Sequence, residues 1–300
     1  MRQAPRHSAG IVTFTVGKND PKILQDFIAA KLSLSRRMAK AVIDGRETWV
    51  NRSCIWIARH TLNTGDVIDI PARVAKGATK GDVPSANKKE KRHIRVLWSD
   101  DNYLVADKPS GVLSCGADNS AEAILRAQEN LPNLVAVHRL DRDTTGALLF
   151  AKSHTAFLAA VEEFKTRKVS KTYHAIVAGE FKFPRTTIDA PLDGERAVTR
   201  AERLAANRDA SFLALKIETG RTNQIRRHLA SVRHPVIGDR VFGKKSVADP
   251  RMMRVTRQML HASTLELRNP LDLKNTIKAH SPLPADFRRT LALFGMGNRK

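Results

Sequence analysis

The sequence contains few cysteines, no long apolar run and no surplus of acidic residues. Only Cys54 and Cys115 occur among its 300 residues. Two distant cysteines form neither a disulfide framework nor a zinc finger, and they fit a reducing compartment. No run of about 18 apolar residues is present, so we expect no membrane-spanning helix. Residues 1–10 lack the apolar stretch of a secretory signal, and we therefore expect a cytoplasmic protein.

Several common catalytic and metal-binding patterns are also missing. The sequence has no paired-histidine helix, no EF-hand loop, no serine nucleophile elbow and no Cys-x-x-Cys pair of the zinc deaminases. Residues 238–245 read GDRVFGKK and nearly match a phosphate-binding loop, but Lys245 stands where a magnesium-binding hydroxyl is required. We therefore expect no metal site, and a nucleotide-hydrolysing RNA remodeller is the weakest of the function classes considered.

The sequence does have a large positive charge. Its 52 Lys and Arg residues face 30 Asp and Glu residues, for a formal net charge of +22. Hydrophobic residues make up 42% of the chain, which argues against a disordered basic tail and for a folded core. A folded chain this basic usually binds a polyanion, most often nucleic acid.

Three segments differ in composition. Residues 12–71 alternate apolar and polar residues at the start and then show helical spacing over 23–32 and 35–44. Residues 72–92 are rich in Lys, Gly and Pro and have no apolar periodicity, which predicts a flexible basic linker. A solvated tether and a phosphate-contacting segment are equally open interpretations of this linker. Residues 93–300 form the large third segment.

The helix expected over residues 35–44 has a basic face. Ser35 suits an N-cap position, where a hydroxyl accepts a hydrogen bond from a free backbone N–H. Arg36, Arg37 and Lys40 lie on a face separate from the apolar stripe. This helix is therefore a candidate for salt-sensitive contact with a polyanion.

The large segment mixes strands and helices without a strict strand–helix–strand rhythm. That mixture favours a mixed, largely antiparallel α+β domain over a doubly wound parallel one. We expect Phe157, Leu158, Val161 and Phe164 to form the apolar face of the second of its three helices. The expected strands lie at 94–98, 103–106, 147–151, 172–177 and 212–218, and the expected helices at 121–130, 154–166 and 222–232.

Residues 135–152 place charged residues on a short loop between two apolar strands. Asp141 lies between Arg139 and Arg142, with Asp143 next to them. Positive charge nearby keeps a carboxylate ionised even when it is partly desolvated, and an ionised, positioned carboxylate can act as nucleophile or base. From the spacing alone, a salt-bridged turn is the favoured alternative.

Two further segments carry candidate chemistry. In residues 219–230, Thr222 suits a helix N-cap, and Arg221, Arg226 and Arg227 crowd the start of that helix, where phosphate could bind. An ordinary basic amphipathic helix is an equally good interpretation. Tyr173 lies on a strand and is ordinarily a half-buried sheet residue, although a phenol that faces a cleft could stack on a base and transfer a proton.

These three segments, in this order, resemble the RluA family of pseudouridine synthases, and residues 12–70 resemble an S4 RNA-binding domain. The resemblance covers nearly the whole chain. It predicts an α+β fold, in which a mixed, mainly antiparallel-sheet catalytic domain follows a small α/β S4-like domain. The matching motifs lie at 108–111 (KPSG), 138–146 (HRLDRDTTG), 171–175 (KTYHA), 219–226 (TGRTNQIR), 234–243 (HPVIGDRVFG) and 260–262 (LHA), with the S4-like patterns at 35–45 and 65–70.

The family implies that the protein isomerises uridine in RNA to pseudouridine and needs no cofactor. By resemblance, Asp141 is the catalytic carboxylate, which either attacks C1′ or assists glycal formation by deprotonation. Arg226 pairs with Asp141, and Tyr173 stacks on the target base and handles a proton. Arg139 enters the RNA helix where the uridine is flipped out. The other expected RNA contacts are Lys108, Arg142, Arg221, Asn223 and Gln224 in the catalytic segment and Arg36, Arg37 and Lys40 in the S4-like segment.

The sequence departs from the family pattern at three places. Asn223 replaces the usual His, Ser114 and Cys115 occupy a region where the family often has His, and Phe242 replaces the usual Tyr. The presumed catalytic trio is intact, so we expect these changes to affect substrate range more than activity.

The S4-like segment favours large-subunit ribosomal RNA as the substrate of a monomeric enzyme. A tRNA substrate is the first alternative. A non-catalytic RNA-binding factor on the same scaffold, such as a ribosome-assembly factor, is the second. Intact Asp141, Tyr173 and Arg226 argue against the second alternative.

Overall fold

The computed structural model describes residues 11–44, 48–51, 53–55, 58–72, 93–243 and 249–297. Almost all of the expected linker, residues 73–92, lies outside this described part. The chain divides into two units, Met1–Glu90 with Lys244–Arg254 and Lys91–Gly243 with Val255–Lys300. The short helix α7 (Pro250–Met253) belongs to the first of these groups. Each unit has its own hydrophobic core and is described separately.

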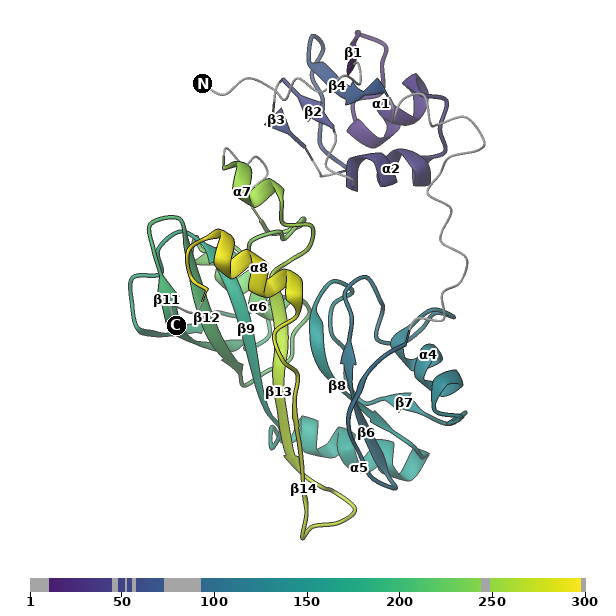
Figure 1. Ribbon diagram of the computed structural model, residues 1–300, viewed down its shortest axis with the longest axis vertical. Helices are drawn as coiled ribbons and strands as arrows, with labels where there is room; N and C mark the ends of the chain where they lie inside the picture. The colour runs from purple at the N-terminus through teal and green to yellow at the C-terminus, as the bar shows by residue number, and fades with distance from the viewer. Residues whose placement is uncertain are drawn as a thin grey trace. The chain divides into compact units, whose positions relative to one another are not determined.

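The small unit packs two helices against a four-stranded antiparallel sheet of order β1-β4-β2-β3 (Figure 1). Its core includes Leu24, Phe27, Ile43 and Ile68, so the helical spacing seen in the sequence does bury one face. Ser35 accepts a hydrogen bond from the Met38 N–H at 3.2 Å, which confirms the predicted cap. The elements are β1 (Ile11–Thr15), α1 (Leu24–Lys31), α2 (Arg36–Asp44), β2 (Trp49–Val50), β3 (Ser53–Cys54) and β4 (Val67–Pro71).

The large unit is built on one ten-stranded sheet. The main path is β10-β11-β12-β9-β13-β8-β6-β5, with β14 paired to β13 and β7 paired to β8. Among the described strands of this sheet, β13 and β8 are the one parallel pair. The strands are β5 (Val96–Ser99), β6 (Tyr103–Lys108), β7 (Val135–Ala136), β8 (Thr145–Ala151), β9 (Ser170–Ala178), β10 (Arg185–Asp189), β11 (Val198–Ala206), β12 (Ala210–Ile217), β13 (Leu260–Arg268) and β14 (Thr276–His280).

The predicted α+β class with a mixed, mainly antiparallel sheet is confirmed. Each of the five strands expected from the sequence overlaps an observed one, and each of the three expected helices is present. The sequence analysis did not identify β10, β11, β13, β14 or the last helix. The helices of this unit are α4 (Ala121–Gln128), α5 (His154–Lys165), α6 (Gln224–Ser231) and α8 (Ala285–Leu293).

Two local predictions about helices need correction. In α5, Phe157 and Phe164 pack against the core as predicted. The fully buried positions are nevertheless Ala156 and Ala160, and Leu158 is 55% exposed, because small side chains let the helix lie close to the sheet. In α6 the N-cap is Asn223 rather than Thr222. Asn223 adopts a left-handed backbone with φ of 53° and makes no side-chain capping bond, because its amide is used elsewhere.

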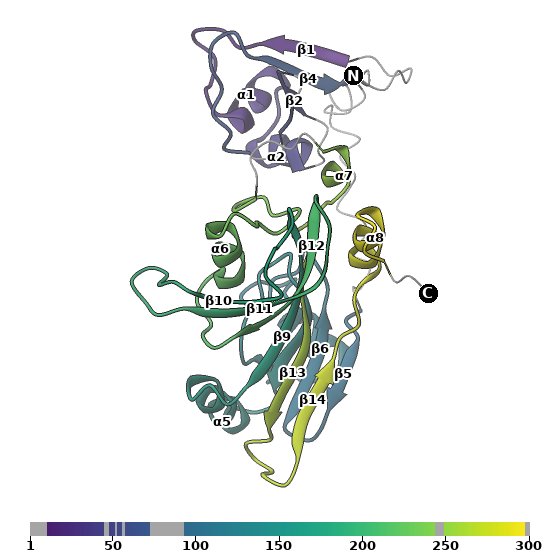
Figure 2. The same cartoon turned by 90° about the vertical axis from the view of Figure 1, so that its left-hand side faces the viewer.

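Helices α6 and α8 cover opposite faces of the sheet (Figure 2). On one face, the α6 residue His228 meets Thr199 of β11 at 2.9 Å. On the other face, the Phe287 ring of α8 lies 6.0 Å from the Phe212 ring of β12. Successive strand residues point to alternate faces, so each residue of β9, β11 and β12 can be assigned to the α6 side or the α8 side.

Candidate active site

The loop that carries Asp141 connects β7 to β8, and the buried side chain of Lys108 supports it from the protein interior. The Lys108 ammonium donates to the backbone carbonyls of Pro109, Val112 and Arg142 at 3.0, 2.7 and 2.9 Å. Its side chain is fully buried, and burial lowers its pKa to about 7. The predicted RNA contact for Lys108 is therefore wrong, since this side chain supports the loop from inside the protein.

Two more residues fix the same loop. Ser114 both accepts from the Leu140 N–H at 2.9 Å and donates to the Leu140 carbonyl at 3.0 Å, so it anchors the residue next to Asp141. Gly146 has φ of +115°, and a Cβ added there would lie 2.1 Å from the Ala262 carbonyl oxygen. Only glycine allows β8 and β13 to approach so closely at the end of the loop.

Asp141 meets Arg226 in a direct ion pair. The distance from Arg226 Nη1 to Asp141 Oδ2 is 2.9 Å, although the two residues are 85 positions apart in the sequence. The Asp141 side chain is 30% exposed and the Arg226 side chain 8%. A carboxylate that solvent can reach and that is bound to a buried guanidinium has a fixed orientation, as the predicted role requires.

Arg226 is itself held by three other residues. Its Nε and Nη2 donate to both carboxylate oxygens of Asp239 at 2.6 and 2.8 Å. Its Nη1 also donates to Asn223 Oδ1 at 2.7 Å, and its guanidinium lies 5.0 Å from the centre of the Phe242 ring. These ion pairs raise the pKa of Arg226 even though burial opposes them. The guanidinium is therefore a fixed, permanent cation.

Tyr173 lies on the same side of the sheet as this cluster. It pairs across the ladder with Leu215 of β12, on the α6 side, and only 6% of the residue is exposed. Burial, followed by the nearby negative charge of Asp141, raises the pKa of the phenol well above its usual value. The phenol therefore stays protonated at neutral pH, and it is close enough to Asp141 for the two groups to interact electrostatically.

The other arginines predicted to contact RNA from the large unit differ in exposure and in their partners within the protein. Arg139 is exposed. Arg142 is exposed too, and its Nε donates to the Gly111 carbonyl at 3.2 Å. Arg221 forms an ion pair with Glu195. Arg142 and Arg221 thus each bind a partner other than Asp141.

Gln224 and Asn223 also differ from the expectation. Gln224 is buried, and its amide donates to the Val198 carbonyl and Thr199 Oγ1 while its oxygen accepts from Thr219. The predicted RNA contact for Gln224 is therefore wrong, since this side chain attaches α6 to β11. Asn223, which replaces the usual family His, contributes its amide oxygen to the Arg226 network.

Sequence analysis assigned no role to Asp239 or Gln258. Asp239 contacts Arg226 as described, and Gln258 donates to Thr144 Oγ1 at 2.7 Å and approaches Asp141 Oδ2 at 3.5 Å. The signal for Asp239 was present in the motif at 234–243, where two glycines flank it. A Cβ on Gly238 would lie 2.0 Å from the Arg257 carbonyl oxygen, so the turn that presents Asp239 depends on glycine.

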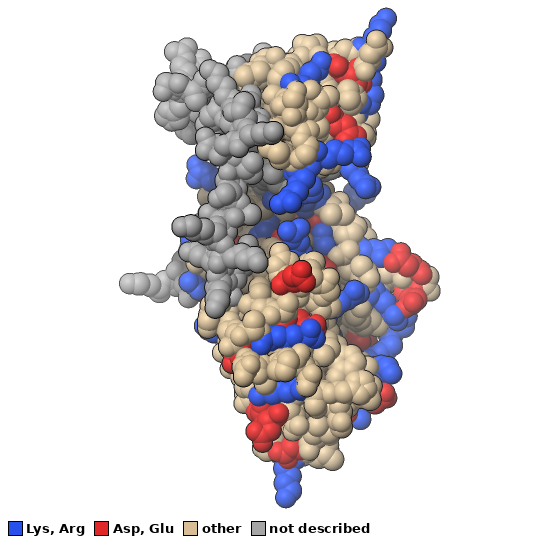
Figure 3. All heavy atoms as spheres, turned by 90° about the vertical axis from the view of Figure 1, so that its right-hand side faces the viewer, with Lys and Arg blue, Asp and Glu red and all other residues tan. Residues whose placement is uncertain are grey.

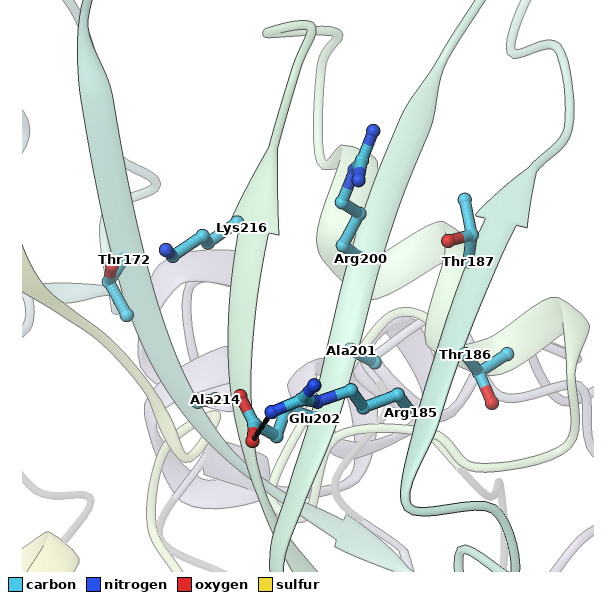
Figure 4. A pocket seen from close by; sticks show the side chains of 9 residues that line it. All are labelled: Thr172, Arg185, Thr186, Thr187, Arg200, Ala201, Glu202, Ala214 and Lys216. Carbon is cyan, nitrogen blue, oxygen red and sulfur yellow. Dashed lines mark hydrogen bonds and ion pairs between the residues drawn. The ribbon is translucent and has the colours of Figure 1, made fainter.

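A pocket of about 400 Å³ lies on the other face of the sheet and is separate from this cluster (Figure 4). Thr172, Lys216, Arg200 and Thr187 form one row across four strands, and each occupies the face opposite to Tyr173. Arg185 and Glu202 pair with each other at 3.0 Å beside that row. The pocket is thus a hollow on the α8 side of the sheet, away from Asp141, and Thr, Arg, Lys and Glu side chains are among those that line it.

Surface charge, metal ligands and membrane-spanning helices were the other features of interest in the part of the chain that the structure describes. On the face drawn in Figure 3, basic and acidic side chains of the large unit are interspersed. The part of the chain that the structure describes contains no cluster of three or more metal-ligating His, Cys, Asp or Glu residues. Its described helices include none that is long and apolar enough to cross a membrane.

Comparison with known proteins identifies this arrangement. Residues 102–231 match the family model described as RNA pseudouridylate synthase. The "Ribosomal large subunit pseudouridine synthase D" of Xanthomonas campestris is 31% identical over 90% of this chain and 86% of its own length. The protein of the same name from Nitrosomonas europaea is 32% identical over 81% of this chain and 77% of its own.

A solved structure agrees with this result. The human "RNA Pseudouridylate Synthase Domain Containing 1" has a TM-score of 0.55 and 25% sequence identity, covering 70% of this chain and 98% of that one. The chain belongs to the RluA family of RNA pseudouridine synthases, and it is an isomerase that converts uridine in RNA to pseudouridine.

Proposed function

We propose that this enzyme modifies uridines of large-subunit ribosomal RNA, with Asp141 as its catalytic carboxylate. The printed names of the relatives from Xanthomonas campestris and Nitrosomonas europaea support the ribosomal substrate. The observation that carries the proposal is the 2.9 Å contact between Asp141 and Arg226, which forms from two motifs far apart in the sequence. A tRNA substrate is the alternative within the same activity.

The reaction rearranges bonds without a net change in composition. The bond between N1 of uracil and C1′ of the ribose breaks, the base rotates, and C5 bonds to C1′. The hydrogen on C5 leaves and N1 gains a proton, so the product has the same atoms and oxidation level as the substrate. The chemistry therefore requires a nucleophile or base near the ribose and groups that hold the detached base.

Asp141 supplies the nucleophile or base. Its carboxylate is partly exposed and is oriented by Arg226, so it can approach a ribose carbon. Attack at C1′ and deprotonation that leads to a glycal both suit this geometry. Tyr173, a protonated phenol beside Asp141, stacks on the target base and donates or relays a proton.

Base flipping precedes this chemistry, because a uridine stacked inside an RNA helix cannot reach Asp141. Arg139 is two residues before Asp141 and is exposed, which allows it to occupy the space that the flipped uridine leaves. Arg142 and Arg221 each donate one hydrogen bond to a backbone carbonyl of the protein, and they contact phosphates of the bound RNA.

The N-terminal segment, residues 12–71, acts as an S4-like RNA-binding domain, joined through residues 72–92 to a catalytic domain at 93–300. Arg36, Arg37 and Lys40 are exposed on α2, and Arg36 also pairs with Asp26 at 2.7 Å. Exposed cations on one helix bind phosphates in a salt-dependent manner. The protein works as a cytoplasmic monomer.

The test is pseudouridine mapping across total RNA from cells with and without this protein. Sites that disappear from large-subunit ribosomal RNA, and return with the wild-type protein but not with the Asp141→Asn variant, are the expected result. Sites that disappear from tRNA instead would transfer the proposal to the tRNA substrate. Unchanged maps in both RNA classes would favour the non-catalytic RNA-binding factor.

A further inference from the structure

Arg226 contacts two carboxylates, and the one that is not at the reaction centre holds it more firmly. We propose that Asp239 is a positioning residue that serves as the counter-ion of Arg226 while Asp141 reacts. This inference rests on the proposed role of Asp141. It assigns a function to a residue that does not itself contact the RNA.

Asp239 is built into its position by the turn that follows it. Its side chain is completely buried, and Oδ1 accepts from the backbone N–H groups of Val241 and Phe242 at 2.8 and 3.0 Å. A Cβ on Gly243 would lie 2.1 Å from the Asp239 carbonyl oxygen, so glycine closes the turn. The carboxylate therefore has a fixed orientation before it meets any other side chain.

The contact between Asp239 and Arg226 is of the strongest kind that these groups form. Two parallel N–H···O bonds of 2.6 and 2.8 Å join them, and both side chains are almost completely removed from solvent. Bidentate, charge-assisted bonds are stronger and more directional than single ones. The contact to Asp141 is a single bond from Nη1 to a carboxylate that is 30% exposed. Arg226 is thus anchored by Asp239, and it presents Nη1 to Asp141.

The charges give this arrangement a chemical consequence. When Asp141 forms a bond to C1′ or takes up a proton, its carboxylate loses its negative charge. A buried guanidinium without a counter-ion is costly, because removing one partner of a buried pair leaves an uncompensated charge. Asp239 keeps its two hydrogen bonds to Arg226, so the buried guanidinium still has a carboxylate partner when Asp141 is neutral. This lowers the barrier at the step where Asp141 reacts, and it leaves the affinity for RNA unaffected.

The first experiment compares Asp239→Asn with Asp193→Asn. Asp193 is a matched control, because it forms a bidentate pair with Arg227, the next residue of the same helix, and it is 73% exposed. We expect Asp239→Asn to lower the single-turnover rate at saturating RNA by about 100-fold, with the Kd for RNA within about twofold of wild type. The Asp193→Asn variant should keep the wild-type rate.

The second experiment asks whether Asp239 acts through Arg226. In an Arg226→Gln background no buried cation needs a counter-ion, so adding Asp239→Asn should lower the rate no further. An Asp239→Glu variant, which keeps the charge and adds one methylene group, should recover part of the rate that Asp239→Asn loses. If melting curves show that Asp239→Asn is unfolded, Asp239→Glu takes its place. Its single-turnover rate is then measured in the wild-type background and in the Arg226→Gln background.

Three outcomes would overturn the inference. One is a rate for folded Asp239→Asn within about threefold of wild type, well short of the 100-fold loss expected. The second is a parallel loss of rate and RNA affinity. The third is a double variant whose loss equals the product of the single losses. Asp141→Asn measured alongside separates the two proposals: full turnover by that variant removes the proposed function, whereas an inactive Asp141→Asn with a normal Asp239→Asn removes only the role of Asp239.

Discussion

Lys108 donates a hydrogen bond to the backbone carbonyl of Arg142, the residue directly after Asp141, at 2.9 Å. This contact connects the end of β6 to the loop that carries Asp141. It explains why Lys108, which was expected to contact RNA because of the motif it lies in, is buried in the structure. The side chain positions the loop, and its ammonium group donates hydrogen bonds to three carbonyl groups of the protein.

Replacing Lys108 by Met tests that role. The variant removes the bonds to three buried carbonyls, so we expect the free energy of unfolding to fall by about 3 kcal/mol. The slope of log K for RNA against log salt should not change, because Lys108 neutralises no phosphate. Urea unfolding and binding at several salt concentrations measure both quantities. A slope reduced by about one unit would show that Lys108 contacts RNA after all.

Gly146→Ala tests the close approach of β8 to β13. The added methyl group would collide with the Ala262 carbonyl oxygen, and φ of +115° is strained for alanine, so we expect a loss of at least about 4 kcal/mol or no folded protein. Gly194→Ala is the control, because Gly194 has φ of +79° with no atom within 4 Å of the added group. That variant should lose only about 1 kcal/mol. Equal losses in the two variants would contradict the close approach as the cause.

The stability of the large unit should fall as the pH is lowered below 7. Burial lowers the pKa of His138 to about 3 and that of His174 to about 4, and it also lowers the pKa values of His228 and His261. In the unfolded chain these imidazoles take up protons near pH 6.5, whereas the folded protein keeps them neutral. The unfolded state therefore binds more protons between about pH 6.5 and pH 4, and acid favours it.

Urea unfolding at pH 7 and pH 5 measures this effect, and we expect a difference of at least about 2 kcal/mol. His138→Phe should make the pH dependence shallower, because it keeps the ring that stacks on Phe164 and removes the titrating group. A free energy of unfolding that rises on acidification would contradict the buried, neutral state of these histidines.

The basic face of α2 has a separate expected effect. Replacing Arg36, Arg37 and Lys40 by Gln should weaken RNA binding and reduce the salt slope by about two units, if three phosphates are neutralised there. The single-turnover rate at saturating RNA should remain within about twofold, because these residues supply affinity and not chemistry. An unchanged slope would remove the S4-like function from this segment.

The sequence predicted those features that depend on short stretches of chain. The Ser35 cap, the helix over 154–166 and the strand that carries Tyr173 follow from local spacing and cap chemistry, and the structure confirms them. The meeting of Asp141 with Arg226 was available only from the resemblance, since 85 residues separate them. Composition and periodicity do not encode such a contact.

The errors arose where tertiary packing decides. Leu158 looked like a core residue from its spacing, but the sheet accepts the smaller Ala156 and Ala160. Lys108 and Gln224 were expected to contact RNA because they lie in motifs of the family, but each has several partners inside the fold. Asp239 was overlooked because its importance depends on where the guanidinium of Arg226 lies, which only the folded chain determines.

The most direct test of the account is turnover by Asp141→Asn on an RNA that the wild-type protein modifies. The substitution keeps the size of the side chain and removes its negative charge, so the account predicts no detectable pseudouridine together with an RNA affinity within about threefold of wild type. Pseudouridine formed by this variant at the wild-type rate would contradict it.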